Sequence, residues 1–330
     1  GISATLVADP PQVISPARTI RLSQVLPDKR GSVVSTLELG SASDRLAVAG
    51  DDHVIRLFDL SQPDQIEQGK YKELKGHDDW VHALAFGSQE GLLASFGQER
   101  KIVLWNPQTG QELLTLHDTP RGGRAMSITS DGGRLAVGGF EPKVCIFDLS
   151  SGEKQLTLDA PGTMIERVVF SPDGTKVAAA GRTGIVRVWD AGTGSLIADL
   201  RGDDRKLHAI TWSPDSRMIA GGGLSGKIFI WDVATREKLG ELPQRPTKMM
   251  TLNWFDHRQL ASAGSDNLIR IWDLTTFEEV KQLAGHTGSV ATLAFNPARG
   301  TMISGGYDTT ICIWELDQQD TDRITLRDAN

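Results

Sequence analysis

A histidine, a serine and an aspartate near the C-terminus could together supply a general base, a nucleophile and an orienting carboxylate. They are His286, Ser304 and Asp308, and Trp314 follows them. Hydrolases that use this set expose the serine, in one large class on a sharp turn flanked by glycines. The sequence has no such glycine-flanked serine, so we expect these residues to be structural rather than catalytic.

The remaining histidines and glycines offer no second kind of chemistry. His82 and His208 hold equivalent positions in their segments, but a zinc site needs three or four ligands in one place. The glycine-rich pieces at 138–139 and 221–223 lack a phosphate-binding spacing followed by a helix. We therefore expect no catalytic centre, no metal and no cofactor.

These residues belong to a repeated unit. An aromatic residue recurs after a run of apolar, largely β-branched residues, and a polar residue follows it each time. The intervals between the aromatic residues are 47, 42, 42, 42, 41 and 42. Between them, short alternating runs separated by Gly, Asn and Pro predict antiparallel strands with tight turns. The aromatic residues are Phe58, Trp105, Phe147, Trp189, Trp231, Trp272 and Trp314.

The last copy opens with Gly285-His286 and closes with Trp314-Glu315. A Gly-His to Trp-Asp pattern with a period in the forties is typical of propeller blades. Over about residues 18–327 the chain resembles the tryptophan–aspartate (WD) repeat β-propeller family. The resemblance implies an all-β fold, a seven-bladed β-propeller of four-stranded antiparallel blades, with the ring closed by a terminal strand.

In this family, a tryptophan, a serine or threonine, a histidine and an aspartate form a hydrogen-bond chain inside a blade. Each polar group would be buried and so needs a partner. In the sixth repeat Arg245 stands where the histidine would be, and the first repeat keeps only Asp52. The resemblance assigns the complete chain to His286, Ser304, Asp308 and Trp314. It assigns a second copy, with Glu99 in place of the aspartate, to His77, Ser95 and Trp105.

The ends of the chain suggest how the ring closes. Residues 1–17 contain three prolines and predict an extended arm or linker, with residues 18–330 forming a single propeller. Residues 18–26 alternate like the outer strand that precedes each later repeat, but residues 322–327 do so too. The resemblance favours the N-terminal strand. A first residue that is not Met leaves open that the chain is excised from a longer protein.

The net charge and the hydropathy of the chain narrow the classes of partner that we expect. The formal net charge is −7, with a pI of about 5.5. A general nucleic-acid binder carries net positive charge on its binding domain, so we expect no nucleic acid. No run is long and apolar enough to span a bilayer, so we expect no membrane insertion.

In the family, partners bind the top face, where the turns between middle strands meet the loops that enter the inner strands. Aromatic, Met and Arg side chains are enriched at interface centres. The candidate partner-binding residues are Trp80, Phe140, Met164, Arg182, Lys206, Leu224, Lys248 and Tyr307.

Charge is unevenly distributed over these loops. Blades three to six carry mostly cations there, with Asp203 and Asp204 opposing them. The same positions of blades one, two and seven carry Asp51, Asp52, Asp78 and Asp79, with Lys29 and Arg30 as exceptions. Such a basic arc would suit an acidic or phosphorylated peptide with an apolar anchor. Its members are Arg121, Arg124, Arg182, Arg205, Lys206, Arg245 and Lys248.

The sequence thus predicts a non-catalytic scaffold or adaptor that binds a protein or peptide on its top face. The alternative is a partner-docking, substrate-docking or regulatory propeller domain of a larger multidomain enzyme. A third possibility is a propeller enzyme with a metal or quinone in its channel. The compartment and the oligomeric state stay unassigned.

Overall fold

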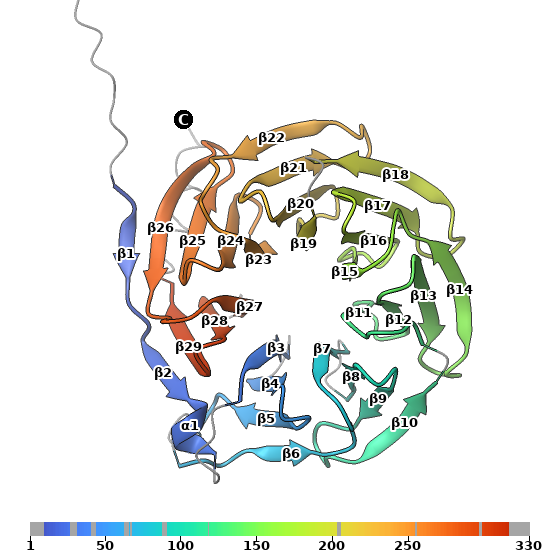
Figure 1. Ribbon diagram of the computed structural model, residues 1–330, viewed down its shortest axis with the longest axis vertical. Coiled ribbons are helices and arrows are strands. Elements are labelled where there is room, and N and C mark those ends of the chain that lie inside the picture. The colour runs from blue at the N-terminus through green and yellow to red at the C-terminus, as the bar shows by residue number, and fades with distance from the viewer. Residues whose placement is uncertain are drawn as a thin grey trace, which may run out of the picture.

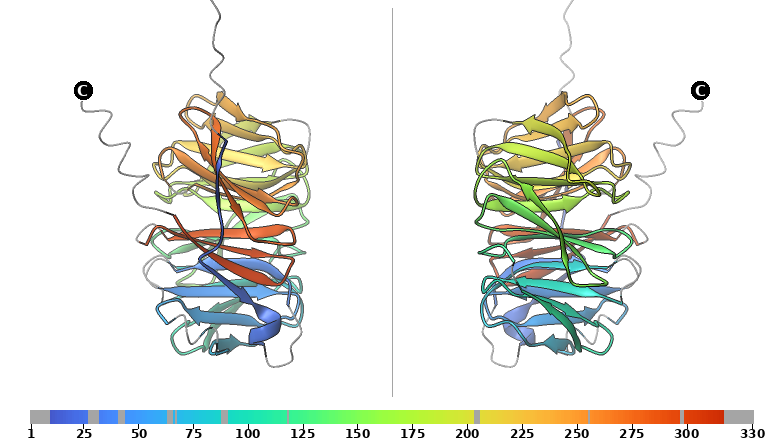
Figure 2. Two further views of the ribbon diagram at one scale, coloured as in Figure 1. Left: turned by 90° about the vertical axis from the view of Figure 1, so that its left-hand side faces the viewer. Right: turned by 90° about the vertical axis from the view of Figure 1, so that its right-hand side faces the viewer.

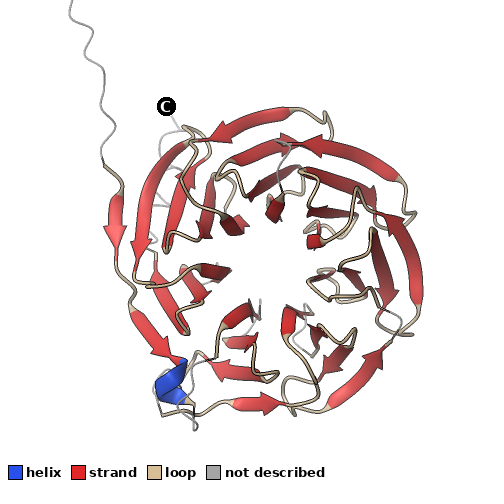
Figure 3. Ribbon diagram, viewed as in Figure 1, coloured by secondary structure: helices blue, strands red, loops and turns tan. Residues whose placement is uncertain are grey.

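A ring of seven β-sheets makes up the computed structural model (Figure 1). The ring is a disc, seen edge-on in Figure 2, and many of its strands run across the thickness of the disc. The structure describes residues 10–26, 32–40, 44–62, 66, 68–87, 91–117, 119–202, 206–254, 256–296 and 299–316. Strands dominate these residues (Figure 3), and the expected all-β, seven-bladed propeller is confirmed.

In each blade the strands follow the chain from the innermost strand outward. The last blade differs only in its outermost strand, which comes from the N-terminus. Blade one consists of β3 (Val34–Leu39), β4 (Arg45–Gly50), β5 (Ile55–Asp59) and β6 (Lys72–Leu74). Blade two consists of β7 (Val81–Phe86), β8 (Leu93–Gly97), β9 (Ile102–Trp105) and β10 (Glu112–Leu116). Blade three consists of β11 (Ala125–Ile128), β12 (Arg134–Gly138), β13 (Lys143–Asp148) and β14 (Lys154–Asp159).

The later blades repeat this order. Blade four consists of β15 (Ile165–Phe170), β16 (Lys176–Gly181), β17 (Ile185–Asp190) and β18 (Leu196–Arg201). Blade five consists of β19 (Leu207–Trp212), β20 (Met218–Gly223), β21 (Ile228–Asp232) and β22 (Lys238–Leu242). Blade six has β23 (Met249–Trp254), β24 (Gln259–Gly264), β25 (Leu268–Asp273) and β26 (Glu278–Ala284). Blade seven has β27 (Val290–Asn296), β28 (Thr301–Gly306), β29 (Thr310–Glu315) and β2 (Arg18–Arg21).

The hydrophobic core lies between neighbouring blades. One cluster joins Ala49 and Ile55 of blade one to Val81 and Trp105 of blade two, and similar clusters follow around the ring. Both faces of the second strand of a blade are covered, as β8 shows with five buried residues. A single blade cannot cover its own faces, so the ring is the unit that folds.

The N-terminal strand closes the ring, as expected. Residues Arg18–Arg21 of β2 pair antiparallel with Thr310–Ile313 of β29. Residues 322–327, the competing segment, lie outside the described residues. The prediction of a strand through residue 26 was wrong, because Leu22–Val25 form the helical turn α1. A strand that buried Leu22 and Leu26 would also bury Gln24, whereas the helical turn leaves Gln24 exposed.

A further strand lies in the segment for which we expected an arm. β1 (Gln12–Ile14) pairs in parallel with β26 and gives blade six a fifth strand. The side chain of Ile14 packs against the core between blades six and seven. The boundary at residue 17 stays a prediction. Within the described residues, no helix has the length and apolar character that a bilayer crossing requires.

Candidate partner-binding site

A β-bulge recurs at the start of the inner strand in every blade except the third. In these six blades the first residue of the inner strand pairs with a glycine, and the next residue of the inner strand is left out of the pairing. A bulge turns the skipped side chain out of the regular pleat. In blade three, Arg124 precedes the pairing of Ala125 with Gly138 and takes the same place. The skipped residues are Ser35, His82, Glu166, His208, Met250 and Ala291.

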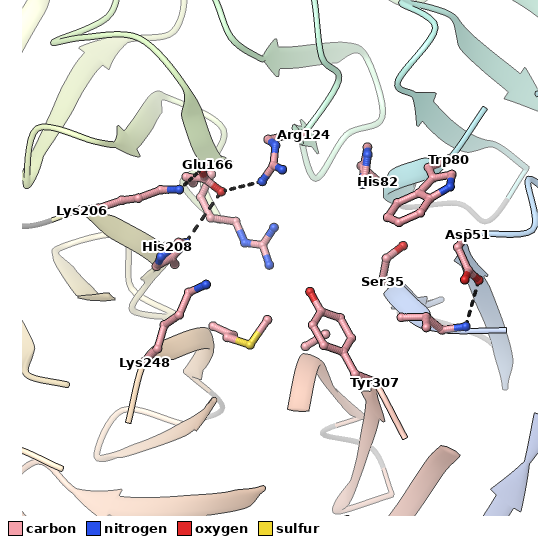
Figure 4. Close-up of a pocket in the computed structure, with 14 residues that line it drawn as sticks. Ser35, Asp51, Trp80, His82, Arg124, Glu166, Lys206, His208, Lys248 and Tyr307 are labelled. Carbon is pink, nitrogen blue, oxygen red and sulfur yellow. Dashed lines mark hydrogen bonds and ion pairs between the residues drawn. The ribbon is translucent and has the colours of Figure 1, made fainter. Parts of the chain in front are cut away.

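These seven side chains line one cavity of about 580 Å³ at the mouth of the central channel. The cavity lies where the loops into the inner strands meet the turns between middle strands. Its two halves differ in chemistry (Figure 4). One half carries mainly charged groups, namely Arg124, Glu166, Lys206, His208 and Lys248. The other half carries Ser35, Asp51, Trp80, His82 and Tyr307.

Glu166 holds two of the cations in the charged half. Its carboxylate lies 3.1 Å from Arg124 Nη1 and 2.5 Å from Lys206 Nζ. Burial alone would raise the pKa of Glu166, but His208, Lys206 and Arg124 outweigh burial and hold that pKa at about 2. Glu166 is therefore ionised at neutral pH, and it organises this half of the mouth.

The two histidines of the cavity are neutral at pH 7. Burial lowers the pKa of His82, although a hydrogen bond with Gln98 at 3.0 Å opposes the shift. Burial likewise lowers the pKa of His208 against the opposing effect of Glu166, whose Oε2 lies 3.7 Å from His208 Nδ1. No group of three or more His, Cys, Asp or Glu side chains among the described residues could hold a metal ion.

Below the mouth lie two ionisable groups that the sequence analysis did not single out. Arg167, next to the bulged Glu166, lines the mouth cavity and also a smaller cavity of about 190 Å³ beneath it. Glu38 of β3 lines the smaller cavity. Burial raises the pKa of Glu38 to about 8 despite the opposing charge of Arg167. Burial also lowers the pKa of Arg167. Glu38 is therefore largely protonated at pH 7.

The other half of the mouth presents two exposed aromatic rings. Trp80 is 47% exposed and Tyr307 is 50% exposed. The Trp80 ring lies 5.9 Å from the His82 ring at a tilt. Asp51 accepts hydrogen bonds of 2.9 Å from the Ser32 hydroxyl and the Val33 backbone amide, which ties the turn to the entering loop.

Four of the eight candidate partner-binding residues line the mouth cavity: Trp80, Lys206, Lys248 and Tyr307. The other four do not. Phe140, Arg182 and Leu224 are exposed on turns outside the cavity, and Met164 is half-buried with a φ of 57°. The amide of Met164 donates to the Phe140 carbonyl at 3.2 Å, so these two residues belong to one connected rim.

The structure alters the expected basic arc. Arg124 and Lys206 share Glu166, and Arg245 pairs with Glu279 at 2.6 Å. Arg205, Asp203 and Asp204 lie outside the described residues. The exposed arc residues that bind no carboxylate through their side chains, within the part of the chain that the structure describes, are Arg121, Arg182 and Lys248.

The serine–histidine–aspartate set lies inside blade seven, away from this mouth. The Trp314 indole donates to Ser304 Oγ at 2.9 Å, and His286 Nε2 lies 2.7 Å from the same oxygen. His286 Nδ1 lies 3.0 Å from Asp308. Ser304 has no exposed surface, so no substrate reaches its hydroxyl.

Blade two has a similar chain. The Trp105 indole donates to Ser95 Oγ at 2.8 Å, and His77 Nε2 lies 2.6 Å from that oxygen. Nδ1 of His77 lies 2.5 Å from Glu99, which thus fills the aspartate position. Ser95, like its counterpart in blade seven, is fully buried.

In blades one and six an arginine of the third strand pairs with the turn aspartate, a contact that the sequence analysis missed although it placed Arg245 at the histidine position of blade six. The carboxylate of Asp52 lies 2.5 Å from Arg56, and that of Asp266 lies 2.6 Å from Arg270. In blade six, Arg245 also lies over the Trp272 ring at 5.3 Å. An aspartate followed four residues later by an arginine in a β-strand was the available signal.

Comparison with known proteins adds the family context. The family model "WD domain, G-beta repeat" matches residues 69–106, 152–190, 194–232, 247–273 and 277–315. The THO complex subunit 6 homolog of Danio rerio is 29% identical over 24% of this chain and 23% of its own length.

Two further relatives match over similarly short stretches. Protein hir-1 of Neurospora crassa is 35% identical over 22% of this chain and 8% of its own length. Protein transport protein SEC13 of Mycosarcoma maydis is 35% identical over 18% of this chain and 18% of its own length. The chain thus covers less than a quarter of each of these relatives.

Proposed function

The chain belongs to the WD domain, G-beta repeat family, and we propose that it is a non-catalytic scaffold or adaptor that binds a protein or peptide partner at the channel mouth. One relative, the THO complex subunit 6 homolog, carries a name that makes it part of an assembly. The observation that carries the proposal is the open cavity between two exposed aromatic rings and a cluster of cations. Trp, Tyr and Arg are the side chains that dominate binding energy at interfaces.

The charge of the mouth supports an acidic or phosphorylated partner. Four cationic side chains line the cavity, against the two carboxylates of Asp51 and Glu166. The chain as a whole carries a formal charge of −7, so this local excess is opposite to the global charge. The same global charge favours a protein partner over nucleic acid. Trp80 and Tyr307 would hold an apolar anchor beside the acidic group.

Affinity purification from the native host, followed by mass spectrometry, tests this proposal. We expect a partner that wild type retains and that Trp80→Ala loses, because Trp80 is half exposed at the mouth. Leu113→Ala is the matched control, since Leu113 is 52% exposed on β10, the outer strand of the same blade. Equal recovery of every protein by Trp80→Ala and wild type would contradict binding at the mouth.

A further inference from the structure

We propose that the channel mouth binds one oxyanion of a docked segment, a side-chain carboxylate or a phosphate monoester, on the guanidinium of Arg167. This inference rests on the proposed function, because the partner carries the anion. It assigns the binding to a residue of the inner strand β15, below the loops, rather than to the loop cations.

The first argument is that Arg167 has unused hydrogen-bonding capacity. Within the described part of the chain, no side chain or carbonyl accepts a hydrogen bond from the Arg167 guanidinium, and no carboxylate forms an ion pair with it. An arginine carries five N–H donors in a planar fork that matches the geometry of a carboxylate or phosphate. Arg167 is partly exposed, and it lines both cavities, so an anion that enters them can reach it.

The second argument is that the carboxylates near Arg167 offset its burial only in part. Burial lowers the pKa of Arg167 and the charge of Glu166, the preceding residue, opposes that effect, but Arg124 and Lys206 already engage the Glu166 carboxylate. Glu38 is close enough to influence Arg167, but its pKa of about 8 leaves it largely uncharged at neutral pH. A charged guanidinium in a protein channel without a direct ion-pair partner is costly, and an incoming anion would relieve that cost.

The third argument is the uniqueness of this position in the ring. Six other residues directly follow the bulged position or its equivalent in blade three, and none is charged: Thr36, Ala83, Ala125, Ala209, Thr251 and Thr292. Among these seven equivalent positions, Arg167 is therefore the one cation. Lys248, exposed at the mouth, adds a second charge that an anion entering the cavity would pass.

The size of the cavity fits a side chain rather than a folded domain. A volume of about 580 Å³ lies within the range of pockets that take small ligands or a few side chains. An acidic side chain of a docked segment can therefore reach Arg167 while the segment itself lies across Trp80 and Tyr307.

The test is titration of the purified protein with inorganic phosphate and, separately, with acetate, followed by NMR or calorimetry. We expect Arg167→Gln to weaken binding of the preferred anion about tenfold or more, as for loss of a charged hydrogen-bonding group. Arg236→Gln is the control, because it removes one positive charge from an exposed turn between β21 and β22. We expect this control to bind as wild type does.

The two probes distinguish the sources of the oxyanion. Tighter binding of phosphate assigns a phosphorylated segment, and tighter binding of acetate assigns a carboxylate. Arg167→Lys keeps the charge without the fork and guards against misfolding of the glutamine variant; we expect it to retain part of the affinity. Wild-type affinity in Arg167→Gln, or no binding of either anion by wild type, would overturn the inference.

Partner capture separates this inference from the proposed function. A partner that Trp80→Ala loses but Arg167→Gln keeps at full affinity would leave the proposed function standing and overturn the anion site. Phosphate or acetate binding that depends on Arg167, with no partner lost by Trp80→Ala, would support the site and contradict the proposed scaffold role.

Discussion

Asp308 shows how one side chain can fix a blade. Its carboxylate accepts from the Thr287 amide at 2.8 Å and from the Thr310 hydroxyl at 2.7 Å, and it contacts His286. Asp308→Ala would remove all these acceptors and leave buried donors unsatisfied. We expect the free energy of unfolding to fall by about 1–3 kcal/mol. Urea denaturation at pH 7 measures the change.

The control and the pH dependence sharpen that prediction. Asp52 is no neutral control, because its carboxylate pairs with the buried Arg56. Asp273, which accepts from the Thr275 amide in a turn, is better, and Asp273→Ala should cost less. Burial would raise the pKa of Asp308, but its hydrogen bonds lower it below 3.8. The difference between wild type and Asp308→Ala should therefore be full above pH 3.8 and narrow as the pH falls further. Equal losses in the two alanine variants would contradict the assignment.

For single residues, the sequence could predict a structural role only where that role does not depend on the β-bulges. The spacing of His286, Ser304 and Trp314 recurs in blade two, and the family resemblance implied their hydrogen-bond partners in advance. Glu166 and Arg167 could not be placed, because each bulge shifts the alternation of its inner strand by one residue. A pattern of strict alternation would have put one of these two adjacent side chains away from the channel.

Among the structural elements, β2 makes the closure of the ring testable. It pairs with β29 over four residues, and the adjoining Leu22 and Leu26 are buried between blades. Burial of such side chains contributes about 1.5–3 kcal/mol each. Deleting residues 1–26 should therefore lower the denaturation midpoint strongly. Among the described elements, deleting residues 1–15 removes β1 alone, a three-residue parallel pairing, and it should cost much less.

Deletion at the C-terminus tests the same closure from the other end of the chain. Removing residues 317–330, which lie outside the described residues, should change the midpoint little if β2 alone closes the ring. A loss as large as that from deleting residues 1–26 would give the C-terminal segment a structural role. The family resemblance implied that a terminal strand completes blade seven, whereas α1 depends on packing of Leu22 and Leu26 that alternation alone does not reveal.

In the whole molecule, the ring converts a sequence repeat into an asymmetric surface. Six bulged positions and their counterpart in blade three face one mouth, yet their side chains range from Glu166 and Arg124 to Ala291. The repeated residues of the blades thus determine the fold, whereas the side chains that differ between blades at the mouth would determine which partner binds. Family resemblance could predict the shared part. The pairing of Glu166 with Arg124 and Lys206 depends on which blades become neighbours around the mouth.

This asymmetry predicts electrostatic steering of the partner. Arg182 is exposed on the turn between β16 and β17, and the described residues include no ion-pair partner for it. Arg182→Glu should slow association with an acidic partner and flatten its dependence on salt, with little effect on folding. Stopped-flow or surface plasmon resonance measurements over a range of sodium chloride concentrations would show both effects.

Arg236→Glu is the control, because it makes the same charge change on a turn at the opposite end of the strands and should matter less. If Arg182→Glu associates as wild type does while Trp80→Ala abolishes binding, the partner lies over blades one, two and seven, and the basic arc plays no part.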